Sequence, residues 1–557
     1  MTKVISLSES VQQFIFPECV LHFSFTHNRA MAYAWEIIRQ NKNQALQLEL
    51  VGTGMLEHAI ALVWAGQVRK LVGAFFGETY PSSAPNKVIM KQAKEERLTL
   101  EYWTNLTIPQ RFMAAANGFD YVPTRSLQGS SLLQTHLNSG VAFYTHDENT
   151  GKDTVMIRSL VPDVAIVHGS VADEDGNTVV TPPYGEDLWG IYAAKKVVVI
   201  AEKIVNAKKI ESLSHLVKVP AHLVDAVVEL PYSAHPFGVS PIGYSEHSYS
   251  EDYKFRTSFR HAVQRGESIE TWMEREHLDV SHNRFLSHLG EERLHELERA
   301  ARPNTTETIK HDDRPLTDVE TFIIVSSRRI AQKIKAENYT MLLAGIGISH
   351  LTAWLVHRQL EAEGVKVQLL TETGFYGYKP ALGDSYIFNF NNLYNNKKQS
   401  SFVEILGQMV GDKNHRTLAI LSGAQIDQYG QINSTMIPEK NLFLTGSGGA
   451  NDIAAVAHGV VAMMYGDGRK FVSTVPHVTS PGHHVHQIYT PEGVLERGDE
   501  ADAFQVVEWM HKDSMSRFNQ LIPWKADVHE KCEVAGPVSA KELTWLREFD
   551  PDRIFLA

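Results

Sequence analysis

The chain has 557 residues, of which 43% are hydrophobic and 21% charged, and its formal net charge is −12. This length exceeds that of one ordinary core and predicts several domains, with a composition typical of globular proteins. No apolar run approaches the ~20 residues that span a bilayer, and no long basic run suits an extended nucleic-acid surface, so we expect neither a membrane nor a nucleic-acid partner.

Two cysteines, Cys19 and Cys532, are too few for a disulfide framework or a zinc ligand set. Residues 1–6 lack the basic region and apolar core of a signal peptide. We therefore expect a cytoplasmic location.

The first third of the chain alternates between predicted strands and predicted helices. A short helix leads into a strand over 10–23, the segment Phe25-Thr26-His27-Asn28-Arg29 follows, and a helix is predicted over 30–40. Strands are predicted over 46–51, 68–76, 98–103 and 163–167, with the turn Gly52-Thr53-Gly54 and a helix to about residue 65 after the first of them. This alternation predicts a parallel sheet with crossover helices. Gly52 and Gly54 are interpreted as ordinary turn glycines, because the third glycine of a dinucleotide fingerprint is missing.

Two tight hairpins of similar sequence indicate an internal repeat. Asp-Gly and Gly-Asn steps predict one at 170–180, followed by a helix over 188–195 and a strand over 196–201. A strand over 418–421 precedes a second hairpin at 422–433, again with Asp followed three residues later by Gly. Gly52-Thr53-Gly54 also resembles Gly345-Ile346-Gly347. The chain is therefore predicted to be α/β, with two related open domains built on mostly parallel sheets.

A helical excursion is predicted between these halves, at about 244–314. Its Trp and Leu residues recur at helical spacing from Trp272 to Leu297, and residues 302–314 are predicted to form a linker. A helix over 317–334 opens the second half. We expect one domain over 1–316 and another over 317–557.

Glu372 is the first candidate for chemistry. The apolar run Val365 to Leu370 predicts a buried strand, and Thr371-Glu372-Thr373-Gly374 follows it. A carboxylate there lies at the C-terminal edge of a sheet, where open α/β folds place their sites. A desolvated carboxylate can attack an activated acyl group. An ordinary solvated or helix-capping glutamate is an equally valid interpretation of the residues alone.

Gly446-Ser447-Gly448-Gly449-Ala450-Asn451-Asp452 is the second candidate. Three glycines in four residues leave backbone N–H groups uncovered at a predicted helix start, which suits an oxyanion or a phosphate. A sharp strand-to-helix turn explains the same composition.

Two other constellations carry less weight. The histidines His477, His483, His484 and His486 lack accompanying cysteines, so no metal site is expected. Ser422 and His350 have no Gly-X-Ser-X-Gly elbow around them, which disfavours a hydrolase triad.

Several of these motifs, taken in order, resemble family I coenzyme A-transferases of the glutaconate type, with the α and β subunit types fused. The α-like stretches are residues 25–32, 65–72, 161–167, 172–173, 176–177 and 234–236. The β-like stretches are residues 345–347, 371–374, 423–425, 430–433, 446–452 and 479–482.

The resemblance implies a ping-pong transfer of coenzyme A from an acyl-CoA to a carboxylic acid, with Glu372 as nucleophile and an acyl-glutamyl anhydride and a glutamyl-CoA thioester as intermediates. It implies oxyanion donors around Gly448, Gly449 and Ala450. Gly446, Asn451, Gln425 and Lys379 are expected to contribute to binding, Gln425 by orienting a carboxylate and Lys379 by meeting a phosphate of coenzyme A. Coenzyme A is expected as a substrate, with no permanently bound cofactor, and fusion of the two chain types suggests a homo-oligomer.

The sequence also departs from the family pattern. Phe375, Tyr376 and Tyr378 are bulky beside Glu372, and we expect them to reshape the acyl pocket. The stretch His483-His484-Val485-His486 departs as well. Three alternatives therefore stay open: an acyl-CoA hydrolase, a C–C cleaving enzyme or decarboxylase on the same fold, and a non-catalytic metabolite sensor.

Overall fold

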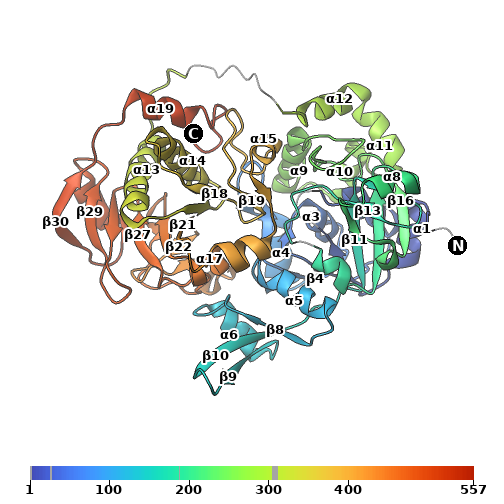
Figure 1. The fold of residues 1–557 in the computed structure, drawn as a ribbon, viewed down its shortest axis with the longest axis horizontal. Helices are drawn as coiled ribbons and strands as arrows, with labels where there is room; N and C mark the ends of the chain where they lie inside the picture. Colours follow the sequence, from blue (N-terminus) through green and yellow to red (C-terminus); the bar gives the residue numbers. More distant parts are fainter. Residues whose placement is uncertain (1–2, 25–27, 187, 304–311) are drawn as a thin grey trace.

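The computed structural model describes residues 3–24, 28–186, 188–303 and 312–557. The predicted segment at Phe25, Thr26 and His27 lies outside the described residues, as do residues 304–311 of the predicted linker. The two halves of the chain each contain one large sheet, and they lie next to each other (Figure 1). The predicted α/β class with mostly parallel sheets is confirmed.

The first half is built on a seven-stranded sheet in which all neighbouring strands run parallel. Its central strands are short Val-, Ile- and Leu-rich runs buried on both faces, as expected for a sheet covered by helices. In sheet order the strands are β16 (Ala226–Glu229), β14 (Lys196–Ala201), β11 (Val164–Gly169), β1 (Val20–Phe23), β2 (Leu48–Val51), β4 (Val68–Gly73) and β7 (Thr99–Tyr102).

The helices of this half connect and cover those strands. They are α1 (Leu7–Phe14), α2 (Met31–Gln40), α3 (Glu57–Trp64), α4 (Lys87–Lys94), α5 (Thr107–Ala116), α6 (Ser131–Asn138), α7 (Trp189–Ala193), α8 (Ala207–Ser212) and the 3-10 turn η1 (Ala221–Leu223). Two small sheets flank them: β3 (Gly54–Met55), β5 (Phe75–Glu78) and β6 (Ala84–Pro85), and β12 (Val171–Ala172), β13 (Thr178–Val179) and β15 (Val217–Val219).

The second half is built on a ten-stranded mixed sheet. Its strands in sheet order are β20 (Lys398–Gln399), β19 (Phe375–Tyr376), β18 (Gln368–Leu370), β17 (Met341–Ala344), β21 (Thr417–Leu421), β26 (Gly459–Met463), β27 (Val485–Tyr489), β28 (Gly493–Glu496), β29 (Gln505–Trp509) and β30 (Asp527–Val534). The run from β18 to β27 is parallel, and the strands at both edges add antiparallel pairs.

The long helix α13 (Asp318–Glu337) opens this half, with Thr317 and Glu320 forming the capping box that fixes its start. The other helices are α14 (Ile348–Ala362), α15 (Phe390–Tyr394), α16 (Phe402–Glu404), α17 (Ala450–Val456), α18 (Ser514–Leu521) and α19 (Ala540–Arg547), with the short turns η2 (Ile405–Met409), η3 (Pro438–Lys440) and η4 (Gly468–Lys470). Two short ribbons are β22 (Gln425–Ile426) with β23 (Ile432–Asn433), and β24 (Met436–Ile437) with β25 (Leu442–Phe443).

Both large sheets repeat one order of connection. The order β2-β1-β11-β14 in the first sheet corresponds to β18-β17-β21-β26 in the second. Both predicted hairpins are present, β12–β13 after β11 and β22–β23 after β21. Each is closed by an aspartate whose Oδ1 accepts the backbone N–H four residues later, Asp173 from Asn177 at 2.8 Å and Asp427 from Gln431 at 3.0 Å.

The predicted correspondence between the turns at Gly52-Thr53-Gly54 and Gly345-Ile346-Gly347 is wrong, because the two turns follow strands that are not equivalent in the two sheets. Gly52-Thr53-Gly54 follows β2, whose counterpart β18 precedes Glu372, whereas Gly345-Ile346-Gly347 follows β17, the counterpart of β1. The turn at Gly52 is therefore the first-half equivalent of the Glu372 turn. Glycine spacing alone misassigned it, because glycines follow strands in both positions.

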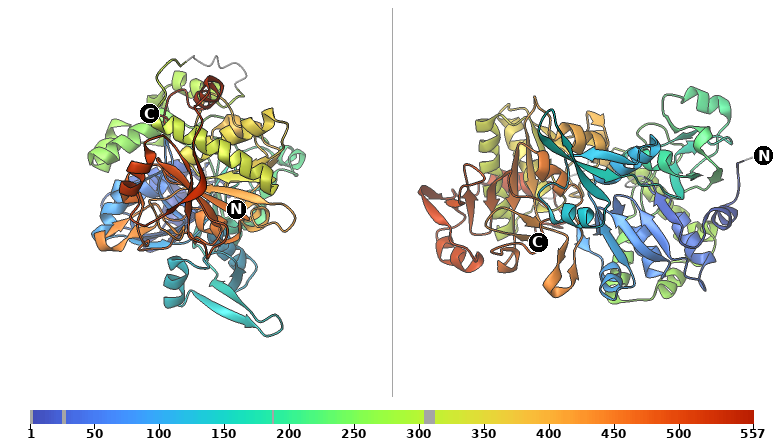
Figure 2. Two further views of the ribbon diagram at one scale, coloured as in Figure 1. Left: turned by 90° about the vertical axis from the view of Figure 1, so that its left-hand side faces the viewer. Right: turned by 90° about the horizontal axis from the view of Figure 1, so that it is seen from below.

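Two peripheral pieces complete the fold. The antiparallel sheet of β8 (Tyr121–Thr124), β10 (Lys152–Arg158) and β9 (Ala142–Asp147) was not predicted, and it projects from the body of the molecule (Figures 1 and 2). The predicted helical excursion consists of α9 (Tyr253–Arg265), α10 (Ile269–Arg275), α11 (His282–Leu289) and α12 (Glu291–Ala300). Trp272, Phe285 and Leu297 anchor it in the core of the first half.

Within the described ranges, no helix has both the length and the apolar character required to cross a membrane. The division of the chain at residue 316 stays a prediction.

Candidate functional site

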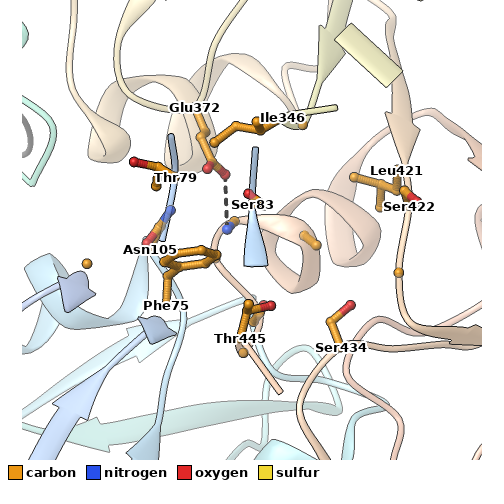
Figure 3. Close-up of a pocket in the computed structure, with 18 of the residues that line it drawn as sticks. Phe75, Thr79, Ser83, Asn105, Ile346, Glu372, Leu421, Ser422, Ser434 and Thr445 are labelled. Carbon is orange, nitrogen blue, oxygen red and sulfur yellow. Dashed lines mark hydrogen bonds between the residues drawn. The ribbon is translucent and has the colours of Figure 1, made fainter. Parts of the chain in front are cut away.

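A cavity of about 460 Å³ lies between the two halves and contains Glu372 (Figure 3). The first half lines it with Thr53, Gly54, Leu56, Phe75, Thr79, Ser83, Pro85 and Asn105. The second half contributes the turn at Glu372, the glycine loop from Leu444 to Ala450, the segments 345–346 and 421–424, Phe388, Phe402 and Lys470. Neither half alone encloses this space.

Glu372 lies in the tight turn that joins β18 to β19. Thr371 N–H donates to the Phe375 carbonyl at 3.0 Å, and Phe375 N–H donates to Thr371 Oγ1 at 3.1 Å. Gly374 closes the turn with a φ of +120°, and a Cβ there would lie 2.2 Å from the Ser400 carbonyl oxygen. The turn therefore requires glycine at this position and holds Glu372 at the C-terminal end of β18, as predicted.

The Glu372 carboxylate receives hydrogen bonds from both halves of the molecule. Gly449 N–H donates to Oε2 at 3.0 Å (Figure 3), and the Asn105 side chain donates a further hydrogen bond. Burial raises the pKa of Glu372 to about 7, and these two donors act in the opposite direction. A glutamate with such a pKa exists in both protonation states near neutral pH, which is typical of functional carboxyls.

The glycine loop is held against the first half along its length. Phe76 N–H donates to the Thr445 carbonyl at 2.7 Å, and Gly448 N–H donates to the Ala74 carbonyl at 3.0 Å. A Cβ at Gly446 would lie 2.5 Å from the Ala74 carbonyl oxygen, so glycine is required for this close approach. These bonds fix the Gly449 N–H group opposite Glu372.

Asp452, in the first turn of α17, carries a second buried carboxyl group close to the site. Its Oδ2 accepts the Leu106 N–H at 3.1 Å. Burial is the main cause that raises the pKa of Asp452 to about 7; the negative charge of Glu372 adds a smaller contribution in the same direction, and hydrogen bonds from Thr104, Ser126 and Leu106 oppose both. The protonation of Glu372 and that of Asp452 are therefore linked.

The structure brings only part of the predicted site together. Gly446, Gly448, Gly449 and Ala450 line the cavity beside Glu372. The other three predicted binding residues point elsewhere, as described next.

Asn451 is buried, where its Oδ1 accepts from Leu127 N–H and its Nδ2 donates to the Thr479 carbonyl, both at 2.8 Å. Gln425 is also buried, and its Oε1 accepts from Asn433 Nδ2 at 2.9 Å. Lys379 is exposed and forms an ion pair with Glu361 at 2.6 Å, away from the residues that line the cavity.

The prediction that Phe375, Tyr376 and Tyr378 shape the acyl pocket is wrong, because none of the three lines the cavity. Phe375 and Tyr378 are buried in the core of the second half, where Trp354 Nε1 donates to the Tyr378 hydroxyl at 2.8 Å. Tyr376 packs on the opposite core of that half. The aromatic residues that line the cavity are Phe75, Phe388 and Phe402.

Sequence reasoning missed several residues of the cavity. Asn105 follows the predicted strand over 98–103, so its position after a parallel strand was an available signal. The sequence predicts ordinary turn glycines at Gly52 and Gly54, yet Gly54 and the intervening Thr53 line the cavity. Lys470 lies in a loop without any motif, and no signal marked it.

The histidines considered for a hydrolase triad or a metal site take part in contacts within the fold. His350 accepts from Gly347 N–H through Nδ1 at 2.9 Å and donates to the Ser385 carbonyl through Nε2 at 2.8 Å, so it is not free to serve Ser422. The rings of His483 and His484 are in contact, with centroids 4.3 Å apart. Among the described residues, no group of three or more His, Cys, Asp or Glu side chains is arranged to hold a metal ion.

Comparison with known proteins places the chain among relatives with the same architecture. The profile of the family described as Coenzyme A transferase matches residues 4–230 and 326–490, on either side of the helical excursion. An uncharacterized protein of Archaeoglobus fulgidus is 32% identical over 254 residues, which cover 45% of this chain and 55% of that protein, so the match spans about half of the relative's length.

Both subunits of the glutaconate CoA-transferase of Acidaminococcus fermentans also match this single chain. One of them is 24% identical, covering 53% of this chain and 94% of its own length, and the other is 29% identical, covering 26% of this chain and 61% of its own length. A crystal structure of an acyl-CoA transferase of Escherichia coli O157:H7, a thioester complex with CoA, superposes with a TM-score of 0.66 at 14% identity. It covers 96% of this chain and 95% of that one, which shows a shared fold over the whole length.

Proposed function

Because the chain belongs to the coenzyme A transferase family, we propose that it moves coenzyme A from an acyl-CoA thioester to a carboxylic acid by a ping-pong route through Glu372. One observation carries this proposal: the Glu372 carboxylate lies in the cavity between the halves with Oε2 bound to the Gly449 N–H at 3.0 Å. Coenzyme A is a substrate in this scheme, and no resident cofactor is needed.

The first step forms an anhydride. With Oε2 engaged by Gly449, the ionised Oε1 attacks the carbonyl carbon of the thioester, and the C–S bond breaks to release the thiolate of coenzyme A. The product is a mixed anhydride between the acyl group and Glu372. The thiolate stays in the cavity as the next nucleophile.

The second step uses the Gly449 contact directly. The thiolate attacks the glutamyl carbonyl carbon, and the negative charge of the tetrahedral intermediate develops on Oε2, the atom that Gly449 N–H already faces. A preorganised N–H donor at this atom stabilises that charge. Release of the acyl group as a carboxylate leaves a glutamyl-CoA thioester.

The acceptor acid then repeats these steps in reverse. Its carboxylate attacks the glutamyl thioester, the thiolate leaves, and attack of the thiolate on the acceptor's acyl carbon yields the new acyl-CoA and free Glu372. In the net reaction the donor acyl group leaves as a carboxylate and the acceptor carboxylate becomes the new thioester of coenzyme A. No oxidation or reduction occurs, and no water is consumed.

The test is chemical trapping. The protein is incubated with a panel of acyl-CoA donors, reduced with borohydride, digested and analysed by mass spectrometry; the expected product carries a primary alcohol in place of the Glu372 carboxyl group. Glu372→Gln is expected to lose transfer and labelling together, whereas the surface change Glu363→Gln is expected to retain both, since Glu363 is exposed and pairs with Lys335. An unlabelled Glu372 together with an active Glu372→Gln variant would overturn the proposal.

The same panel separates the alternatives. Product formed from one acyl-CoA without any acceptor acid would indicate hydrolysis, C–C cleavage or decarboxylation. Tight binding of an acyl-CoA without turnover would indicate a sensor.

A further inference from the structure

Lys470 places a positive charge on the wall of the cavity, and it has no role in the scheme above. Its side chain is half-buried and lines the cavity, with Nζ donating to the Gly423 carbonyl at 2.9 Å. The nearby Asp467 is engaged by Arg469 at 2.7 Å. In the part of the chain that the structure describes, Lys470 forms no ion pair with a carboxylate.

The position of Lys470 is fixed by its neighbours. Phe471 is buried and pairs with Ile426, and Val472 N–H donates to the Ile426 carbonyl at 3.0 Å. A Cβ at Gly466 would lie 2.8 Å from Cδ and Cε of Lys470, so the glycine leaves the space that the lysine stem occupies. The ammonium group is therefore held beside Gly423 and is not a freely moving surface charge.

Small polar groups surround this end of the cavity. Ser422 precedes Gly423, and a Cβ on Gly423 would lie 3.1 Å from Ser434 Oγ. In Figure 3, Ser422 and Ser434 lie to the right of Glu372, whereas Asn105 lies to its lower left. The Ser434 carbonyl also accepts the Gly446 N–H at 2.8 Å, which connects this end to the glycine loop.

The electrostatic surroundings of Lys470 favour a negatively charged ligand. Burial lowers the pKa of Lys470, while the negative charge of Asp467 acts in the opposite direction and only partly offsets the loss of hydration. The Phe75, Phe388 and Phe402 side chains elsewhere on the wall are apolar. An anion beside Lys470 would stabilise the ammonium group and so compensate for the hydration that it loses on burial.

We propose that Lys470, with Ser422 and Ser434, forms a subsite in the cavity that binds an anionic oxygen group of the substrate, at the side of the cavity away from Asn105. This proposal rests on the proposed function, because it assigns a substrate feature to the same cavity. Two groups share the required chemistry: a distal carboxylate on a dicarboxylic acyl chain and a phosphate of coenzyme A.

The kinetic test compares Lys470→Met with the wild type on matched thioesters. Butyryl-CoA and glutaryl-CoA differ by the distal carboxylate, and pantetheine thioesters of both acids lack the phosphates. Loss of a charge-assisted hydrogen bond predicts a rise in KM of about 10-fold to 100-fold for the thioester that carries the anion. A rise limited to glutaryl thioesters identifies the distal carboxylate; an equal rise for both CoA thioesters, absent with pantetheine, identifies the phosphate.

Two further variants control this experiment. Lys470→Arg keeps the charge and is expected to recover most of the affinity. Lys525→Met removes a lysine that is 89% exposed and pairs with Asp527 at 3.1 Å, and it is expected to leave every KM unchanged. An unchanged KM for all four thioesters in Lys470→Met would overturn the subsite.

A binding measurement separates this proposal from the proposed function. Calorimetry with glutarate and with inorganic pyrophosphate needs no turnover, so it tests the subsite even if no acyl-CoA reacts. We expect at least one of the two anions to bind the wild type and to bind Lys470→Met about tenfold or more weakly. If neither anion binds the wild type, or both bind the variant equally well, the subsite is wrong, whatever the outcome of borohydride trapping.

Discussion

At the scale of single residues, the pKa of Glu372 depends on two opposing effects: burial raises it, and two hydrogen-bond donors lower it. The cavity wall removes water from the carboxyl group and raises its pKa to about 7, while Gly449 N–H and the Asn105 side chain favour the charged form. The ionised form of this proposed nucleophile is therefore present at neutral pH although the carboxyl group is buried. The nearby Asp452 adds a second buried carboxyl that responds to the same charge.

The raised pKa of Glu372 predicts how the proposed transfer depends on pH. In the proposed mechanism only the ionised carboxylate attacks, so kcat/KM for the acyl-CoA is expected to fall about tenfold per pH unit on the acid side of a limb near pH 7. Asn105→Ala removes a donor that stabilises the carboxylate, so the pKa rises and the limb moves to higher pH. A profile that is flat from about two pH units below the limb to one above it, or a shift of the opposite sign, would contradict this account.

At the scale of elements, close contacts with neighbouring segments explain why the loop over 446–449 contains glycines. Gly446 approaches the Ala74 carbonyl and Gly449 approaches the Glu372 carboxylate, each too closely for a side chain. Two backbone hydrogen bonds also hold the loop: Gly446 N–H donates to the Ser434 carbonyl, and Gly448 N–H donates to the Ala74 carbonyl. Its glycines therefore serve close contact between the halves in addition to exposing N–H groups.

Gly449→Ala tests the contact between Gly449 and Glu372. The φ of Gly449 is −92°, which alanine adopts without strain, but its Cβ would lie 2.3 Å from Glu372 Oε2. The carboxylate must move off the N–H donor, and kcat is expected to fall about 10²–10³-fold with little change in melting temperature. Gly536→Ala is the matched control, because that glycine is exposed and its Cβ would meet nothing closer than 3.8 Å. Retention of full activity in Gly449→Ala would argue against the donor role.

At the scale of the whole molecule, the helical excursion links the two halves through Arg256. This buried side chain on α9 donates to Glu57 Oε1 at 2.6 Å and to Thr79 Oγ1 at 2.9 Å in the first half. It also contacts the Tyr386 hydroxyl in the second half at 3.4 Å and forms an ion pair with Glu251. Thr79 lines the cavity, so this network positions part of the wall.

Removing Arg256 is expected to destabilise the whole chain. In Arg256→Met, Glu57 and Glu251 lose a buried counterion, which costs about 3–5 kcal/mol in comparable buried pairs. The urea midpoint of unfolding is expected to fall accordingly. Arg265→Met on the same helix is the control, since Arg265 is 62% exposed and pairs with Glu267 only at 3.6 Å. Equal midpoints for the two variants would show that the network contributes little.

Local patterns in the chain were sufficient to predict the α/β class, the paired hairpins, the helical excursion, and both Glu372 and the glycine loop as candidates. Strand periodicity, turn chemistry and glycine spacing are properties of consecutive residues, so they can be read without knowing the fold. The same local rules could not distinguish the turn at Gly52 from the turn at Gly345, because both place glycine after a strand.

The side chains that surround Glu372 depend instead on how the two halves pack. The cavity forms where the halves meet, so Asn105 and Lys470, 267 positions before and 98 positions after Glu372, share its wall. Phe375 and Tyr378 follow Glu372 directly but point into the core, because the packing of β19 and α14 buries their faces. Neighbours in the chain thus determine the turn that holds Glu372, whereas packing between distant segments determines which side chains surround its carboxyl group.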